Sequence, residues 1–161
     1  MTLASLTQVV LDVERHASAA GWDQPPHLFG VVSTEDLLAR EPQLATELDP
    51  SALAGPLTPL DQGELPWYGS LEASLARVAW PPGVLGAVLV TEQVVAGGST
   101  QGTLATGADG GEELRLVVAV MRDGDHMCAV RFRSADEEDS VLTGAEIAPG
   151  LSEQLGATFA D

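Results

Sequence analysis

Hydrophobic side chains recur at alternating steps of three and four through the first twenty residues, which places them on one face of a helix. The acidic residues Asp12 and Glu14 stand between these positions, and we expect both on the solvent side. Gly21 supplies the left-handed residue that commonly ends a helix. The pattern therefore predicts a helix over residues 2–20.

The next part of the chain predicts short elements. Residues 27–32 are rich in β-formers and follow two prolines, so they read as a strand. Hydroxyl and acidic residues at 33–36 are typical of a helix start, and Pro42 interrupts that helix. Four prolines make regular structure unlikely over residues 49–67, although the leucines there favour packing against the domain. Helical spacing resumes over 68–79.

The second half changes to valine-rich runs that predict strands. These cover residues 84–95, 113–122 and 126–134. The Gly/Thr-rich segment 97–111 is too long for a tight hairpin, and we expect a mobile loop there. Asp123-Gly124-Asp125 predicts a hairpin turn between the last two strands.

A short strand over 140–143 and a helix over 149–160 complete the prediction. Clustered strands flanked by helices are typical of an α+β fold. We expect a mostly antiparallel sheet of four to five strands, with the N-terminal, middle and C-terminal helices packed on it. Because 161 residues suit one core, residues 1–161 are expected to form a single domain.

The register of the hairpin follows from the pattern on its two strands. A two-residue loop would place charged residues opposite apolar ones, whereas a three-residue loop pairs Leu116 with Phe132 and Val120 with Cys128. We therefore expect the three-residue loop. It leaves one wholly apolar face, and Arg115, lying opposite Arg133, falls on the other.

Net charge narrows the classes of partner. The chain has 24 acidic and 7 basic side chains, a formal charge of −17. Nucleic acid and anionic membranes both require a positive field, so the charge excludes ordinary binding to either. Every basic residue is an arginine, and lysine and asparagine are absent, a bias that fits a GC-rich genome.

The cellular compartment and cofactors follow from what the chain lacks. It has no apolar run near the ~20 residues that cross a bilayer and no basic start of a secretory signal. The single cysteine, Cys128, has no partner within the chain, which favours the reducing cytoplasm. One cysteine and three scattered histidines do not supply a zinc site, so we expect no metal and no cofactor.

Three arginines form the most informative chemical pattern. Arg115, Arg131 and Arg133 share one face of the predicted hairpin. Guanidinium groups bind carboxylates in a two-point manner, so the trio is a candidate anion-binding site. The alternative is internal neutralisation, in which a helix carrying Asp or Glu covers that face.

Other candidates are weaker. His126 and Cys128 share the apolar face of the hairpin, where cysteine is usually an inert core residue, and Asp12 with His16 suggests a surface pair. The acidic run 136–139 lacks the spacing of a calcium loop. We expect no catalytic residues. The tryptophans, each near a helix end, are expected to pack on the core; they are Trp22, Trp67 and Trp80.

Several segments together carry a family resemblance. They are residues 6–16 (LTQVVLDVERH), 21–26 (GWDQPP), 37–42 (LLAREP), 79–81 (AWP), and 141–144 (VLTG) ahead of 149–151 (PGL). In these segments the chain resembles an uncharacterised family of small acidic proteins from high-GC actinobacteria. The resemblance implies a cytoplasmic bacterial protein and no known activity. A looser architectural similarity is to small acidic secretion chaperones.

These observations favour a non-enzymatic binding or accessory protein. It would act through contacts with a protein partner or as a homo-oligomer, in the manner of a chaperone. The alternative is a domain or enzyme that binds a small anion or carboxylate through its arginine-rich sheet face.

Overall fold

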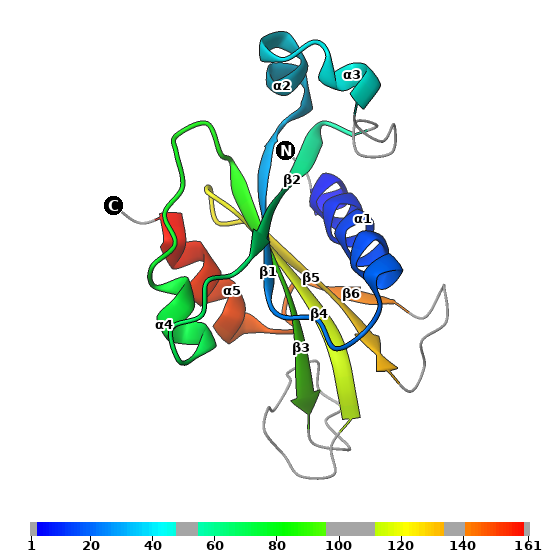
Figure 1. The fold of residues 1–161 in the computed structure, drawn as a ribbon, viewed down its shortest axis with the longest axis vertical. Coiled ribbons are helices and arrows are strands. Elements are labelled where there is room, and N and C mark those ends of the chain that lie inside the picture. Colours follow the sequence, from blue (N-terminus) through cyan, green and yellow to red (C-terminus); the bar gives the residue numbers. More distant parts are fainter. Residues whose placement is uncertain (1–2, 48–54, 96–111, 134–140, 160–161) are drawn as a thin grey trace.

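Helices and strands are mixed in the first half of the chain, and four successive strands precede the last helix in the second half. The computed structural model describes residues 3–47, 55–95, 112–133 and 141–159 (Figure 1). The predicted loop 97–111 and the acidic run 136–139 lie outside the described residues. In chain order the elements are α1 (Leu3–Ala20), β1 (His27–Ser33), α2 (Thr34–Arg40), α3 (Leu44–Glu47), β2 (Leu57–Glu64), α4 (Leu71–Leu75), β3 (Gly86–Val95), β4 (Glu112–Met121), β5 (His126–Phe132), β6 (Leu142–Gly144), α5 (Pro149–Gly156) and the 3₁₀ turn η3 (Ala157–Phe159).

Within the described residues, six strands form one sheet in the order β2-β1-β3-β4-β5-β6. All five neighbouring pairs are antiparallel. The α+β prediction is confirmed, with one strand more than the four to five expected. Helices α2 and α3 lie beyond one end of the sheet, between β1 and β2 (Figure 1).

Helices cover both faces of this sheet. α1 lies against one face, where it contacts β4 and β5, and α5 packs on the other face with α4 beside it (Figure 1). Alternation along β4 serves both cores: Leu116 and Val118 belong to the α5 side, while Val117 and Ala119 belong to the α1 side. The face that carries the arginines is therefore also a core face, which explains the valine-rich strands.

Most predicted elements are present within one or two residues of their expected ends. The first helix spans Leu3–Ala20, and the last begins at Pro149 as predicted. The start of α2 is also as expected, because the Ser33 hydroxyl accepts a hydrogen bond from the Asp36 N–H at 3.3 Å.

Residues 49–67 were expected to lack regular structure, and this is wrong for β2 (Leu57–Glu64). Pro59 stands inside this strand, opposite Val31 of β1. Because β2 is an edge strand, its outer side forms no backbone hydrogen bonds with another strand. A residue without an N–H is therefore tolerated there.

The helix predicted over 68–79 is much shorter than expected. Only Leu71–Leu75 is α-helical. Ser70 caps its start by accepting from the Ala73 N–H at 3.0 Å, and the Ser74 hydroxyl accepts from the Tyr68 N–H at 2.9 Å. These two serines hold the chain before Leu71 in a turn, because their hydroxyls compete with helical hydrogen bonding.

The hairpin register differs from the expected one by two residues. Leu116 pairs with Val130 rather than Phe132, and Arg115 pairs with Arg131 rather than Arg133. The loop has three residues as expected, but it closes one position earlier, with the Met121 N–H donating to the Asp125 carbonyl at 2.7 Å and Gly124 at φ 103°. A shift of two leaves every side chain on its predicted face.

Gly86 allows β3 and β4 to approach closely. A Cβ at this position would lie 2.8 Å from the Val120 carbonyl oxygen and 2.6 Å from the Met121 sulfur. We expect Gly86→Ala to lower the free energy of unfolding by about 1–3 kcal/mol, because the strand backbone must shift.

The matched control is Gly150→Ala in α5, where an added Cβ meets nothing within 4 Å. We expect that variant to be unchanged or stabilised by up to ~1 kcal/mol. Urea unfolding of both variants measures the difference, and equal stabilities would contradict the close approach.

Candidate functional site

A carboxylate of α1 lies between two arginines of the sheet. Glu14 and Arg115 are each 1% exposed, and Arg131 is buried beside them. Arg131 donates from Nε and Nη2 to Glu14 at 2.9–3.2 Å, and Arg115 donates from Nη1 at 2.9 Å. Glu14 was expected on the solvent side of its helix, and this is wrong. Two buried guanidinium groups require a buried counter-charge, and Glu14 supplies it.

Arg115 also fixes the end of α1. Its Nη1 donates to the Ser18 hydroxyl at 2.8 Å, and its Nη2 donates to the Gly21 carbonyl at 2.9 Å. The Trp22 ring lies over the guanidinium, 4.4 Å from its carbon. Arg115 therefore connects β4 with the last turn of α1 and the residues that follow it.

Arg133 lies at the partly exposed end of the same face. It donates to Asp23 at 2.8 and 3.1 Å and to Glu113 at 2.7 Å. The hydrogen bond to Asp23, and after it the one to Glu113, raises the pKa of Arg133. The bond between Arg133 and Asp23 also lowers the pKa of Asp23 below its usual range.

The structure brings the three predicted anion-binding arginines onto one face, and each holds a carboxylate of the chain itself. Arg115 and Arg131 lie opposite each other, with Glu14 between them. Arg133 shares the Trp22 ring with Arg115 and binds Asp23. This geometry matches internal neutralisation, in which a helix that carries an acidic residue covers the arginines. The match is closest at Arg131.

The turn after α1 is held from three sides. Gly21 and Asp23 both have positive φ, 88° and 66°. The two oxygens of Glu92 accept the Asp23 and Gln24 N–H groups at 2.9 and 2.8 Å. Together with the bonds from Arg115 and Arg133, these contacts stabilise a strained turn against β3 and β4.

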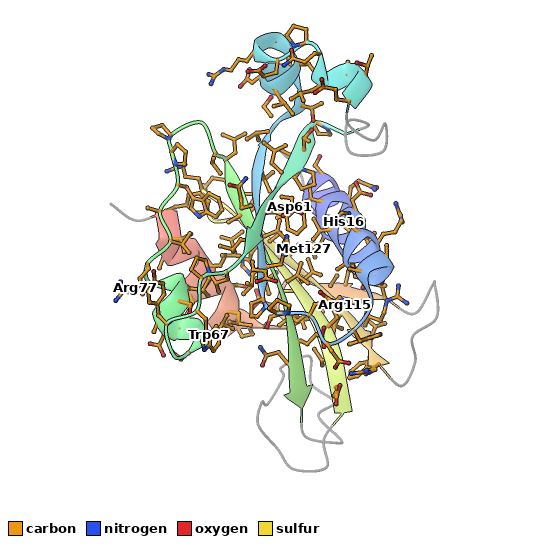
Figure 2. The ribbon with its side chains drawn as sticks, viewed as in Figure 1. His16, Asp61, Trp67, Arg77, Arg115 and Met127 are labelled. Carbon is orange, nitrogen blue, oxygen red and sulfur yellow. The ribbon has the colours of Figure 1, made fainter. Side chains whose placement is uncertain are left out.

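A pocket of about 120 Å³ opens between this turn, the end of α1 and the sheet. Ala17, Ala20 and Phe29 are among its apolar lining residues. His16, His27 and Arg115 bring polar groups to it. Figure 2 shows His16 and Arg115 on the α1 side of the molecule.

Two histidines and an aspartate meet beside this pocket. His27 Nε2 is hydrogen-bonded to Asp61, and His16 Nε2 lies 3.9 Å from the same carboxylate. Both imidazoles contact the Phe29 ring. Partial burial raises the pKa of Asp61, but the Gly63 N–H, the hydrogen bond with His27 and the charges of His27 and His16 together lower it below its usual value. His16 is thus placed next to Asp61 of β2, whereas Asp12 bonds to Gln8 and Arg15.

His126 and Cys128 make separate contacts. The Cys128 sulfur is buried 3.8 Å from the Ser152 hydroxyl, and burial raises the pKa of its thiol. His126 lies near the hairpin tip, where its ring nitrogens contact the Gly124 carbonyl and Glu146.

The three tryptophans have different environments. Trp80 packs on the core as expected, stacks on Phe159 and donates to the Thr158 hydroxyl at 3.0 Å. Trp67 is 56% exposed, so its expected place in the core is wrong. The neighbouring Tyr68 is 49% exposed, and the Arg77 guanidinium lies over its ring at 4.1 Å. Figure 2 shows Trp67 and Arg77 beside α4, away from α1.

Comparison with known proteins identifies the family. The model of the PPA1309-like protein family matches residues 6–160. The chain belongs to this family. The match confirms the resemblance to an uncharacterised family. No curated protein and no solved structure matches the chain.

The described parts of the chain hold neither a candidate membrane-spanning helix nor a candidate metal-binding group. No helix there has the length and apolar content to cross a membrane. No group of three or more His, Cys, Asp or Glu side chains there is arranged to hold a metal ion.

Sequence reasoning missed the residues that organise the site. Glu14 follows Val10 by four positions and precedes Ala17 by three, so it occupies the apolar stripe of α1. An acid inside that stripe, together with arginines at alternating positions of apolar strands, was the signal for the buried cluster. The contact between His27 and Asp61 carries no such signal, because it depends on the unpredicted strand β2.

Neutralising Glu14 tests the buried cluster. We expect Glu14→Gln to lower the free energy of unfolding by about 3 kcal/mol or more, since Arg115 and Arg131 then remain buried without their counter-charge. The control is Glu153→Gln on the exposed side of α5, which should stay within about 0.5 kcal/mol of wild type. Denaturant unfolding measures both, and similar losses would contradict the assignment.

Acid titration tests the Asp61 contacts. A lowered pKa means that Asp61 stabilises the fold above its unfolded pKa of about 4 and loses this effect as the pH falls through the folded value. We expect Asp61→Asn to cost about 0.5–1 kcal/mol near neutral pH, because the carboxylate is half-exposed, and nothing in acid. A difference between wild type and variant that grows on acidification would refute this.

Proposed function

We propose that the protein is a non-enzymatic cytoplasmic accessory protein that docks a basic protein partner through the exposed surface formed by Trp67, Tyr68 and Arg77. This surface is called the aromatic surface below. The observation that carries the proposal is the exposure of two neighbouring large aromatic residues with an arginine stacked on one of them.

The composition of the aromatic surface supports a docking role. Tryptophan, tyrosine and arginine are the residues that most often dominate binding energy at protein interfaces. Leu65, two positions before Trp67, and Leu75 are buried in the core, so this aromatic segment is anchored to the fold on both sides. Anchored aromatic residues lose little conformational freedom on binding, which favours affinity.

The charge of the chain supports a basic partner. At −17, two copies of this protein repel each other, whereas a positively charged partner is attracted and steered toward it. The sequence left open a protein partner or a homo-oligomer. The repulsion between copies favours a different protein over a second copy. A chaperone-like role, in which the acidic domain keeps a basic client soluble, is one form of this function.

Anion binding through the sheet arginines has narrower support. Arg131 directs Nε and Nη2 to Glu14, and Arg133 binds Asp23 and Glu113. Only Arg115 of the three lines the pocket. Anion binding by the arginine face is therefore the second candidate function.

The source and compartment belong to the same proposal. Every basic residue of the Lys/Arg class is an arginine, and asparagine is absent. This bias supports an origin in a high-GC actinobacterium. The single cysteine, buried and unpaired, supports a reducing cytoplasm.

Affinity capture followed by binding of the purified partner tests the docking function. We expect the tagged chain to retain a protein of basic isoelectric point, and Trp67→Ala to weaken its binding by at least about tenfold in calorimetry. Raising the salt from about 0.1 to about 0.5 M should also weaken binding, because charge attraction is screened.

Leu142→Ala is the matched control, since Leu142 is 58% exposed on β6 rather than on the aromatic surface. It should bind the partner like wild type. Equal weakening by Leu142→Ala and Trp67→Ala, an acidic partner, or self-association seen by light scattering without any other partner would overturn the proposal.

A further inference from the structure

We infer that the pocket beside the end of α1 binds a small organic monocarboxylate, whose acid group is held by Arg115 and whose apolar body packs on Phe29. The pocket and the aromatic surface lie on opposite sides of the sheet (Figure 2). The inference is therefore independent of the docking function, and it rests on the second candidate function, which it narrows to Arg115.

Arg115 provides the recognition chemistry. Its Nη1 donates to Glu14 and Ser18, its Nη2 donates to Gly21, and no described residue accepts from its Nε. Every fully buried side-chain nitrogen in the described chain has a partner. The Nε–H is the part of the largely buried Arg115 guanidinium that is left for a ligand in the pocket that Arg115 lines. A donor that is held in place by the other hydrogen bonds of its group selects an acceptor.

The direction of approach favours a planar acid. The Trp22 ring covers one face of the Arg115 guanidinium at 4.4 Å, so this face is closed to a ligand and its edge is favoured. Carboxylates bind guanidinium groups at the edge, in a coplanar manner. Because Nη1 is already engaged by Glu14 and Ser18, the ligand meets the Nε side of the group.

The remaining lining fits the body of such a ligand. Phe29, Ala17 and Ala20 give apolar surface, and the imidazoles of His16 and His27 flank the Phe29 ring at centroid distances of 5.9 and 5.2 Å. A volume of about 120 Å³ exceeds the ~10–15 Å³ that a single water needs, and it admits a compact molecule of roughly ten non-hydrogen atoms.

The acidic groups near the pocket are already engaged. Both oxygens of Glu92 accept backbone N–H groups of the turn, at 2.9 and 2.8 Å. Asp61 is paired with His27 and also accepts from the Gly63 N–H at 2.7 Å. Repulsion of an incoming carboxylate is therefore reduced at both positions.

Titration of the ¹⁵N-labelled chain with benzoate tests the site by NMR. Benzoate is a flat apolar body with one carboxylate, and benzyl alcohol is its uncharged counterpart. We expect saturable shifts with benzoate below about 10 mM, centred on the Arg115 Nε–H and the Gln24 amide, and binding of benzyl alcohol at least about tenfold weaker. No saturable shift, shifts centred elsewhere, or equal binding of the alcohol would overturn the assignment.

Two substitutions of alanine by leucine keep the test independent of the buried cluster, since replacing Arg115 itself also disturbs the fold. Ala20→Leu puts a larger side chain at an exposed helix position that lines the pocket, and Ala45→Leu makes the same change on exposed α3. We expect Ala20→Leu to weaken benzoate binding at least about tenfold with an unchanged melting temperature, and Ala45→Leu to bind like wild type. Unchanged affinity in Ala20→Leu would refute the site.

Discussion

The Glu14 carboxylate, placed between Arg115 and Arg131, is the interaction on which the rest of the structure depends. An apolar stripe alone could pack α1 on the valine-rich face in several registers, because the hydrophobic effect is not directional. One buried carboxylate with two guanidinium partners has a single favourable position, so it sets where the helix lies along β4 and β5. Arg115 then fixes the turn at Gly21, and the pocket beside that turn follows.

The sequence predicted the parts of the fold that local chemistry determines. The spacing of α1, the Ser33 cap of α2 and the valine-rich strands each follow from short-range rules. β2 was missed because a proline argues against a strand unless its position at the edge of the sheet is known. The hairpin register was wrong because the three-residue loop lies one position earlier than expected, with Gly124 in the left-handed conformation, and turn geometry overrides side-chain pairing.

The site was only partly predictable, for a related reason. Alternation placed Arg115, Arg131 and Arg133 on one face correctly, since a slip of two residues preserves faces. What each arginine contacts is decided by long-range packing of α1, and no local pattern reports that. The exposure of Trp67 was missed for a different reason: Ser70 and Ser74 hold a turn in place of the first part of the expected helix, and the prediction did not include it.

Cys128 has a practical consequence of a different kind. The only thiol of the chain is fully buried in β5, under the Ser152 side of α5. A reagent that modifies sulfhydryl groups reaches it only when α5 separates from the sheet, and the raised pKa keeps the intact fold unreactive. The rate of labelling under native conditions therefore reports how often this half of the molecule opens, without any engineered probe.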